Sequence, residues 1–285
     1  MRKAHRVTAK AVAKPSRPTV PQKRAELRLI PIQLADEIKP GDSLAEKLIR
    51  SLLENDVVFE SGDILIVKHK IVSKAEGRVV DLTTIKPSAA SLAWAKRYNL
   101  DARVIELALR ESRGVIRRKN GVLITETHHG FICANSGVDV SNVDGGRHAL
   151  LLPTDPDRSA RELYHEIKKR TALAIPVLIT DTFGRPWREG LVDFCIGIAG
   201  MQALRDDRGR RDPHGYTLHA SLEGVADELA ADHGDAYALA ILVGADAIDE
   251  AKLHERIAVN VLLFAGVEIE LPAGVVAFWI RIKPA

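Results

Sequence analysis

The chain has little cysteine, few aromatic residues and no long apolar run. Its 285 residues include only two cysteines, Cys133 and Cys195, which excludes a disulfide framework and fits a reducing compartment. No apolar run reaches the roughly 18–20 residues that a membrane-spanning helix requires. No apolar segment follows the basic N-terminus, as it would in a secretory signal peptide. We therefore expect a cytoplasmic protein with no membrane association.

Several common ligand-binding signatures are also missing. The sequence has no G-x-x-x-x-G-K-[ST] loop, which excludes a P-loop nucleotide site. It has no G-x-G-x-x-G after an expected strand, no H-E-x-x-H and no Cys/His zinc spacing. A G-x-S-x-G nucleophile elbow is absent as well. Dinucleotide-binding, zinc-dependent and serine-hydrolase classes are therefore not supported.

The positive charge of the chain is concentrated at its N-terminus. Residues 1–27 contain eight Lys and Arg but one acid, and three prolines, so the remainder carries a net charge of −4. Such a composition cannot bury enough apolar surface to fold. We expect a disordered basic N-terminal extension at 1–27, followed by one domain at 28–285. The extension could contact nucleic acid, but a solvated extension is the simpler interpretation, and the acidic body argues against a nucleic-acid partner.

Apolar periodicity and capping residues predict a mixture of strands and helices. Ser43 and Glu46 have the spacing of a capping box at a helix start. We expect strands at 29–33, 64–67, 122–125, 131–134, 174–180, 194–198, 238–243, 259–264, 267–271 and 275–282, and further helices at 88–98, 101–111, 159–171 and 225–231. Because helices and strands do not alternate strictly, we expect an α+β or mixed α/β fold, with mixed sheets and helices.

A dense set of reactive residues follows the strand expected at 174–180. Asp181 and Thr182 offer oxygen ligands of the kind that hold a hard cation. Arg185 and Arg188 come soon after and could clamp an anionic substrate. A plain strand-to-loop turn with surface arginines is the alternative. The density of unlike reactive groups around one glycine favours a functional site.

Two further segments could contribute to the same site. Asp139 and Asn142 lie in a turn after the strand expected at 131–134, which makes Asp139 a candidate second carboxylate beside Asp181. The turn residues there also have an ordinary backbone explanation. The third segment carries Lys68, His69, Lys70 and Lys74, which suit phosphate oxygens, although a solvated edge is equally compatible. Carboxylates for a hard cation together with cationic side chains are typical of phosphoryl chemistry, but they do not name a substrate.

Taken together and in this order, these segments resemble the glutamate ligases of the deazaflavin coenzyme F-420. The strings that carry the resemblance are Ile71-Val72-Ser73-Lys74-Ala75-Glu76-Gly77-Arg78, Ala134-Asn135-Ser136-Gly137-Val138-Asp139-Val140-Ser141-Asn142-Val143, Asp155-Pro156-Asp157-Arg158-Ser159-Ala160 and Thr180-Asp181-Thr182-Phe183-Gly184-Arg185-Pro186-Trp187-Arg188. The resemblance runs from about Leu29 to Ala231, with small gaps.

The resemblance implies a homodimeric, mixed α/β ligase that uses GTP and Mg²⁺ or Mn²⁺. Such an enzyme activates a carboxylate of the deazaflavin precursor as an acyl phosphate, which the amine of L-glutamate then attacks. The implied metal ligands are Asp139, Asp181, Thr182 and Asp232. The implied nucleotide-binding residues are Ala35, Asp36, Glu37, Ile38, His69, Lys70, Lys74 and Asn142, and the implied catalytic residues are Lys74 and Arg185.

Departures from the family pattern leave other functions open. After Glu228 the family continues into a longer helix and loop, whereas here the chain runs almost directly to the next expected strand, and Asp232 stands where a Glu ligand is expected. A ligase of the same mechanism with another acceptor is one alternative. A catalytically silent protein that binds metal and nucleotide is another, which the shortened loop favours and the presence of Lys74, Asp139, Asp181 and Thr182 opposes.

Overall fold

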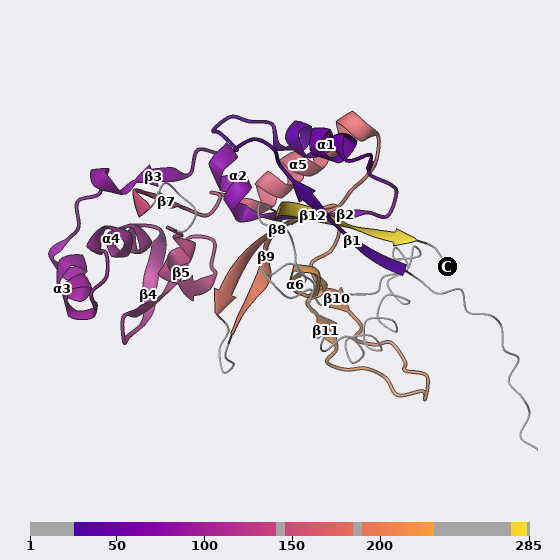
Figure 1. Ribbon diagram of the computed structural model, residues 1–285. Coiled ribbons are helices and arrows are strands. Elements are labelled where there is room, and N and C mark those ends of the chain that lie inside the picture. Colours follow the sequence, from indigo (N-terminus) through magenta and orange to yellow (C-terminus); the bar gives the residue numbers. More distant parts are fainter. Residues whose placement is uncertain (1–25, 141–145, 185–189, 231–274, 284–285) are drawn as a thin grey trace, which may run out of the picture.

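The computed structural model describes residues 26–140, 146–184, 190–230 and 275–283 (Figure 1). The strands are β1 (Glu26–Gln33), β2 (Ile64–Lys68), β3 (Val79–Asp81), β4 (Ser112–Lys119), β5 (Val122–Thr127), β6 (Ile132–Ala134), β7 (His148–Leu150), β8 (Val177–Gly184), β9 (Leu191–Ala199), β10 (Arg205–Asp206), β11 (Leu222–Glu223) and β12 (Val275–Lys283). The helices are α1 (Leu44–Glu54), α2 (His69–Ala75), α3 (Ala89–Tyr98), α4 (Ala102–Arg110), α5 (Pro156–Thr171) and α6 (Val225–Ala230).

The largest sheet is mixed. Within the described ranges its five strands lie in the order β1-β12-β2-β8-β9, so the C-terminal strand β12 lies between two strands from the first part of the chain. The pair β2–β8 is parallel, with Lys68 opposite Thr180, and the other pairs are antiparallel. The parallel pair brings the ends of β2 and β8 to the same edge of the sheet, and this edge carries the candidate site.

Helices cover both faces of this sheet, which explains the continuous apolar runs in its central strands. Leu65 and Val67 of β2 belong to a core that includes side chains of α1, α2 and α5. The alternate residues Ile64 and Ile66 face the other way and pack with side chains of α6. Figure 1 shows α1 and α5 on one side of the sheet and α6 on the other.

A smaller part of the molecule lies beside the main sheet (Figure 1). It contains α3, α4, the antiparallel pair β3–β7 and the antiparallel sheet β4-β5-β6. Its apolar residues form two clusters of their own, one around Leu82, Leu107 and Leu151 and the other around Ile105 and Leu123. Helix α2 lies between this part and the main sheet, so its side chains can reach residues from both.

The expected fold class, in which helices are combined with mixed sheets, is confirmed. Ser43 caps α1 by accepting a hydrogen bond from the Glu46 amide, as its spacing predicts. Most described strands and helices fall within a few residues of their expected positions. The expected strands at 238–243, 259–264 and 267–271 lie outside the described residues, as do residues 1–25 of the expected extension. Strand β1 begins at Glu26, so Glu26 and Leu27, at the end of the expected 1–27 extension, belong to a strand.

Two expectations near the site need correction. The strand expected at 174–180 runs from Val177 to Gly184, so Asp181 and Thr182 lie within β8 and not in a following loop. The antiparallel partner β9 extends the pairing to Gly184, opposite Leu191. The lysine-rich segment expected as a strip or edge forms α2 instead. Within the described residues, no helix combines the length and apolar character that a bilayer crossing requires.

Candidate active site around helix α2

Helix α2 places His69 beside Asp181. The parallel register puts Lys68 opposite Thr180, so the residues that follow them, His69 at the start of α2 and Asp181 within β8, lie near each other at this edge of the sheet. The Nε2 atom of His69 lies 3.2 Å from Oδ1 of Asp181. His69 is buried, and its Nδ1 atom lies 3.3 Å from the Oγ atom of Ser73, one helical turn further along α2.

The next residue of α2 reaches the second expected carboxylate. The Nζ atom of Lys70 lies 2.6 Å from Oδ2 of Asp139, and both side chains are partly exposed. Adjacent residues of one helix therefore contact Asp139 and Asp181, which lie 42 positions apart in the sequence. The structure brings both carboxylates to α2, and each of them faces a different basic side chain.

An unusual left-handed turn presents Asp139. Asn135, Ser136 and Gly137 all have positive φ angles, of 50°, 54° and 70°. For Ser136 this conformation costs free energy, and buried hydrogen bonds hold it there: its amide donates to Thr125 Oγ1 at 2.9 Å, and its hydroxyl donates to the Ala108 carbonyl at 2.7 Å. The backbone of Asp139 is then fixed by reciprocal hydrogen bonds with Leu150.

The third basic residue of α2 faces the segment between β1 and α1. Lys74 Nζ lies 3.3 Å from Oε1 of Glu37. This segment contains the four residues Ala35, Asp36, Glu37 and Ile38, which the resemblance implies as nucleotide contacts. Its side chains point in different directions: Glu37 faces α2, whereas Ile38 is buried in the main core. Ile38 could therefore contact a nucleotide only through its backbone.

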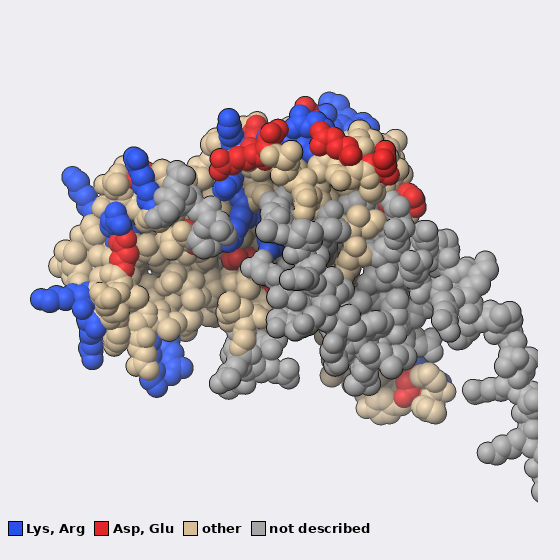
Figure 2. All heavy atoms as spheres, in the orientation of Figure 1, with Lys and Arg blue, Asp and Glu red and all other residues tan. Residues whose placement is uncertain are grey.

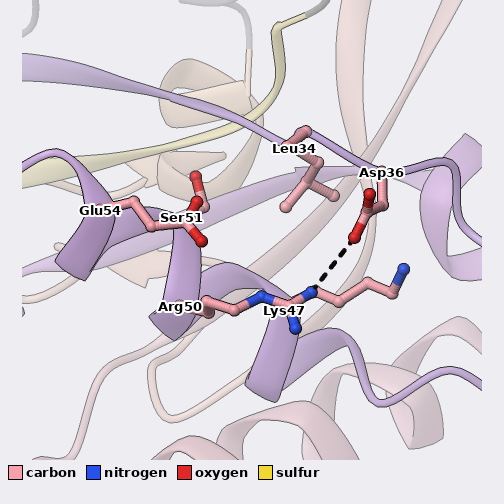
Figure 3. Close-up of a pocket in the computed structure, with 7 residues that line it drawn as sticks. Leu34, Asp36, Lys47, Arg50, Ser51 and Glu54 are labelled. Carbon is pink, nitrogen blue, oxygen red and sulfur yellow. Dashed lines mark ion pairs between the residues drawn. The ribbon is translucent and has the colours of Figure 1, made fainter.

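The other side of the same segment lines a small open pocket. Leu34, Ala35 and Asp36 form one wall, and α1 provides Lys47, Arg50, Ser51 and Glu54. Figure 3 shows Asp36 and Arg50 pointing toward each other, with an ion-pair distance of 3.5 Å. Lys47 also donates to the Glu37 carbonyl at 3.2 Å, so it links the pocket wall to the segment that contacts Lys74.

The residues that follow α2, Glu76, Gly77 and Arg78, anchor the helix to the rest of the molecule. Gly77 follows the helix with a φ of +71°, which a glycine adopts without strain. Glu76 accepts a hydrogen bond from Ser159 of α5. Arg78 donates from Nε to the Leu152 carbonyl at 3.0 Å and pairs with Glu111 at 2.7 Å. These residues therefore fix the position of α2, while Lys74 remains directed toward the site.

Strand β9 contributes a residue that sequence reasoning missed. The hydroxyl of Thr182 donates to Oδ1 of Asp193, its cross-strand partner. Thr182 is exposed and Asp193 is buried beneath it. A carboxylate inside an apolar strand, Leu191-Val192-Asp193-Phe194, is the signal that could have identified it, because buried Asp residues almost always have a specific partner. Asp193 thus fixes the orientation of the Thr182 hydroxyl.

The cysteine nearest the site has no catalytic character. Burial, and to a lesser extent the Asp181 carboxylate, raise the pKa of the Cys133 thiol to about 12. The thiol therefore stays protonated at neutral pH and cannot act as a nucleophile.

Lys and Arg side chains gather over α2, next to the mixed charges that cover α1 and α5 (Figure 2). The accessible chemistry at this edge is therefore that of carboxylates, a hydroxyl and basic groups.

The donor set fits a hard divalent cation. Asp139, Asp181 and Thr182 offer the oxygen ligands that such ions prefer, and Mg²⁺ commonly uses only one or two carboxylates together with waters and substrate phosphates. Across the part of the chain that the structure describes, no group of three or more His, Cys, Asp or Glu side chains converges closely enough to hold a metal ion by itself. Three of the implied site residues, Asn142, Arg185 and Asp232, lie outside the described residues.

Comparison with known proteins places these residues in a family. A model of the family described as F420-0:gamma-glutamyl ligase matches residues 33–233. A protein of Methanopyrus kandleri named coenzyme F420:L-glutamate ligase is 42% identical over 204 residues, which cover 72% of this chain and 79% of that protein. Proteins with the same name from Methanothermobacter thermautotrophicus and Archaeoglobus fulgidus are 41% identical over 205 residues and 37% identical over 236 residues. These matches cover 72% and 80% of this chain, and 81% and 92% of the relatives. The chain therefore belongs to the F420-0:gamma-glutamyl ligase family.

Proposed function

We propose that the protein is a GTP- and divalent-metal-dependent ligase that joins L-glutamate to a carboxylate of the coenzyme F-420 precursor. The observation that carries this proposal is the arrangement of α2, whose His69, Lys70 and Lys74 contact acidic side chains from three other segments. Family membership supports the choice of glutamate and the deazaflavin precursor, because the relatives are named for that reaction.

The proposed reaction has two steps. An oxygen of the precursor carboxylate attacks the γ-phosphorus of GTP, the bond from that phosphorus to the bridging oxygen breaks, and GDP leaves. The amine of L-glutamate then attacks the carbonyl carbon of the acyl phosphate, loses a proton, and displaces inorganic phosphate to form the amide. A bound Mg²⁺ or Mn²⁺ would offset negative charge on the transferring phosphoryl group.

The side chains of α2 and its neighbours have distinct roles in this proposal. Asp139 and Asp181 would hold the cation, with the Thr182 hydroxyl directed by Asp193. Lys70 and Lys74 would turn from their present carboxylate partners to phosphate oxygens when the nucleotide binds, because an ammonium group is a compact charge on a flexible stem. Arg185 would clamp an anionic group, and Asn142, Asp232 and the segment 35–38 would complete the metal and nucleotide contacts.

Formation of a homodimer is a separate part of the proposal. It rests on family membership alone, and sedimentation velocity of the full chain tests it. A single species with twice the mass of the chain, 31.2 kDa, is expected. A monomer at micromolar concentration would contradict this part without affecting the proposed reaction.

A turnover assay tests the reaction. The full chain is incubated with GTP, Mg²⁺ or Mn²⁺, L-glutamate and the deazaflavin precursor, and phosphate release is followed together with product mass. We expect stoichiometric phosphate and a product heavier by one glutamate residue. Phosphate release with other carboxylates, and none with the precursor, would replace the proposed acceptor. No metal-dependent release with any acceptor would support the silent binding protein instead.

A further inference from the structure

The side chain of His69 is buried next to a carboxylate. It is 2% exposed, and its Nε2 atom makes no hydrogen bond of good geometry although it lies 3.2 Å from Oδ1 of Asp181. Buried polar atoms are nearly always hydrogen-bonded, so such an atom in a native structure calls for an explanation. The atom points at a carboxylate already assigned to cation binding.

The other ring nitrogen has a hydrogen-bonding partner. Nδ1 of His69 lies 3.3 Å from the hydroxyl of Ser73, which is fully buried. In metal sites the second ring nitrogen almost always donates to a neighbouring acceptor, which fixes the tautomer and the orientation of the ring. If Nδ1–H donates to the Ser73 hydroxyl, the lone pair of Nε2 faces Asp181. Two electron-rich atoms at that distance repel each other unless a cation lies between them.

The separation of the two atoms matches a shared cation. Adjacent ligands of an octahedral ion at about 2.1 Å from its centre are about 3 Å apart. The 3.2 Å between His69 Nε2 and Asp181 Oδ1 is close to this value. The parallel register of β2 and β8 pairs Lys68 with Thr180, and His69 and Asp181 directly follow these two residues.

We infer that His69 Nε2 and the Asp181 carboxylate are neighbouring ligands of one divalent cation, and that this nitrogen makes the site prefer Mn²⁺ to Mg²⁺. The inference rests on the metal dependence in the proposed function. It assigns His69 to the metal and not to the nucleotide. Mg²⁺ takes oxygen ligands, whereas imidazole is a good ligand for first-row transition ions. An imidazolium paired with Asp181 would instead leave no nitrogen free to coordinate.

Pulsed electron paramagnetic resonance of bound Mn²⁺ tests the inference directly. Mn²⁺ is added to the full chain, with and without GTP, and nitrogen coupling to the ion is recorded. We expect a ¹⁴N coupling in the wild-type protein, which changes to a ¹⁵N coupling when the protein is made with ¹⁵N-labelled histidine. The labelled wild-type sample excludes a nitrogen from guanine and needs no variant that could fold poorly.

Substitutions then identify the histidine. His69→Gln should abolish the coupling and reduce the ratio of Mn²⁺ to Mg²⁺ affinity about tenfold, while Mn²⁺ binding itself persists through the carboxylates. His165→Gln, which changes an exposed histidine on α5, should keep both the coupling and the ratio. Melting temperatures without metal show whether each variant is folded.

The outcomes separate this inference from the proposed function. Mn²⁺ that binds in an Asp181-dependent manner without histidine nitrogen coupling would overturn the role of His69 and leave the proposed ligase intact. Retention of the coupling in folded His69→Gln would assign the nitrogen to another residue and equally overturn the inference. Absence of any specific Mn²⁺ binding, with or without GTP, would overturn both.

Discussion

Lys70 and Asp139 form an ion pair in which an ammonium group occupies a carboxylate that the proposed function assigns to a metal ion. Nζ of Lys70 lies 2.6 Å from Oδ2 of Asp139. A divalent cation can bind Asp139 only in competition with this ammonium, or after it has moved. The same lysine is assigned to nucleotide phosphate, so nucleotide binding would release the carboxylate for the metal. In the proposed function, the pair would therefore couple the binding of the metal to the binding of the nucleotide.

Substitution of Lys70 tests this coupling. In Lys70→Gln, Asp139 loses its cationic partner, so Mn²⁺ affinity without nucleotide should rise several-fold. GTP affinity in the presence of metal should fall at least tenfold, about 1.4 kcal/mol, because one phosphate contact is lost. Isothermal titration calorimetry measures both quantities. Lys86→Gln removes the same charge at an exposed position outside α2 and should change neither. Unchanged or weaker Mn²⁺ binding in Lys70→Gln would show that Lys70 does not compete with the cation.

The left-handed conformation of Ser136 leads to a prediction about stability. Ser136→Ala removes the two buried hydrogen bonds of the hydroxyl, to the Ala108 carbonyl and with Thr125 Oγ1, and should lower the free energy of unfolding by about 1–3 kcal/mol. Glycine adopts a positive φ without the steric cost, so Ser136→Gly should be about 1 kcal/mol more stable than Ser136→Ala. Urea unfolding of the two variants measures the difference. An alanine variant as stable as the glycine variant would show that the backbone is not strained at this position.

The main sheet was largely predictable because burial on both faces leaves a clear record in the sequence. The runs around Leu65 and Leu178 are continuously apolar, and the capping residues Ser43 and Asp101 lie at helix starts. The end of β8 was not predictable. Its polar residues from Asp181 onward have the composition of a loop, and only pairing with β9 keeps them in a strand.

The candidate site was predicted in its composition but not in its geometry. Lys70 and Lys74 were assigned to one basic strip, whereas α2 directs them toward Asp139 and Glu37, which come from separate segments. The distances from these lysines to their carboxylate partners depend on the register of β2 with β8 and on the turn at Ser136. Neither the register nor the turn can be derived from local propensity. Asp193 was missed because its role depends on a partner across the β8–β9 pair.

A carboxylate of α4, Glu106, which contacts the start of α3, should make stability depend on pH. Hydrogen bonds from the Ser88 backbone and from the Ser88 and Ser91 hydroxyls lower the pKa of Glu106 from 4.5 to about 2. Because the pKa of Glu106 is lower in the folded state than in the unfolded state, the ionised carboxylate stabilises the folded protein at pH values above the unfolded-state pKa. This contribution is therefore full above about pH 4.5 and is lost as the pH falls toward 2.

Glu106→Gln should therefore lower the free energy of unfolding by about 1–3 kcal/mol at pH 7. The difference from wild type should shrink as the pH is reduced below 4.5. Urea unfolding at a series of pH values measures it, with Glu54→Gln at an exposed position as the control. A difference that stays constant down to pH 3 would show that the charge of Glu106 does not contribute.

In the proposed function, Asp181 beside α2 holds the cation through which the protein binds GTP. Calorimetric titration of GTP into wild type and Asp181→Asn, each with and without Mg²⁺, tests it most directly. Asp56→Asn is the matched control, because Asp56 is exposed and its positive φ is one that asparagine also adopts. We expect Mg²⁺-dependent GTP binding in wild type and Asp56→Asn, and an affinity at least tenfold lower in Asp181→Asn. Metal-dependent GTP binding of undiminished affinity in folded Asp181→Asn would contradict the account.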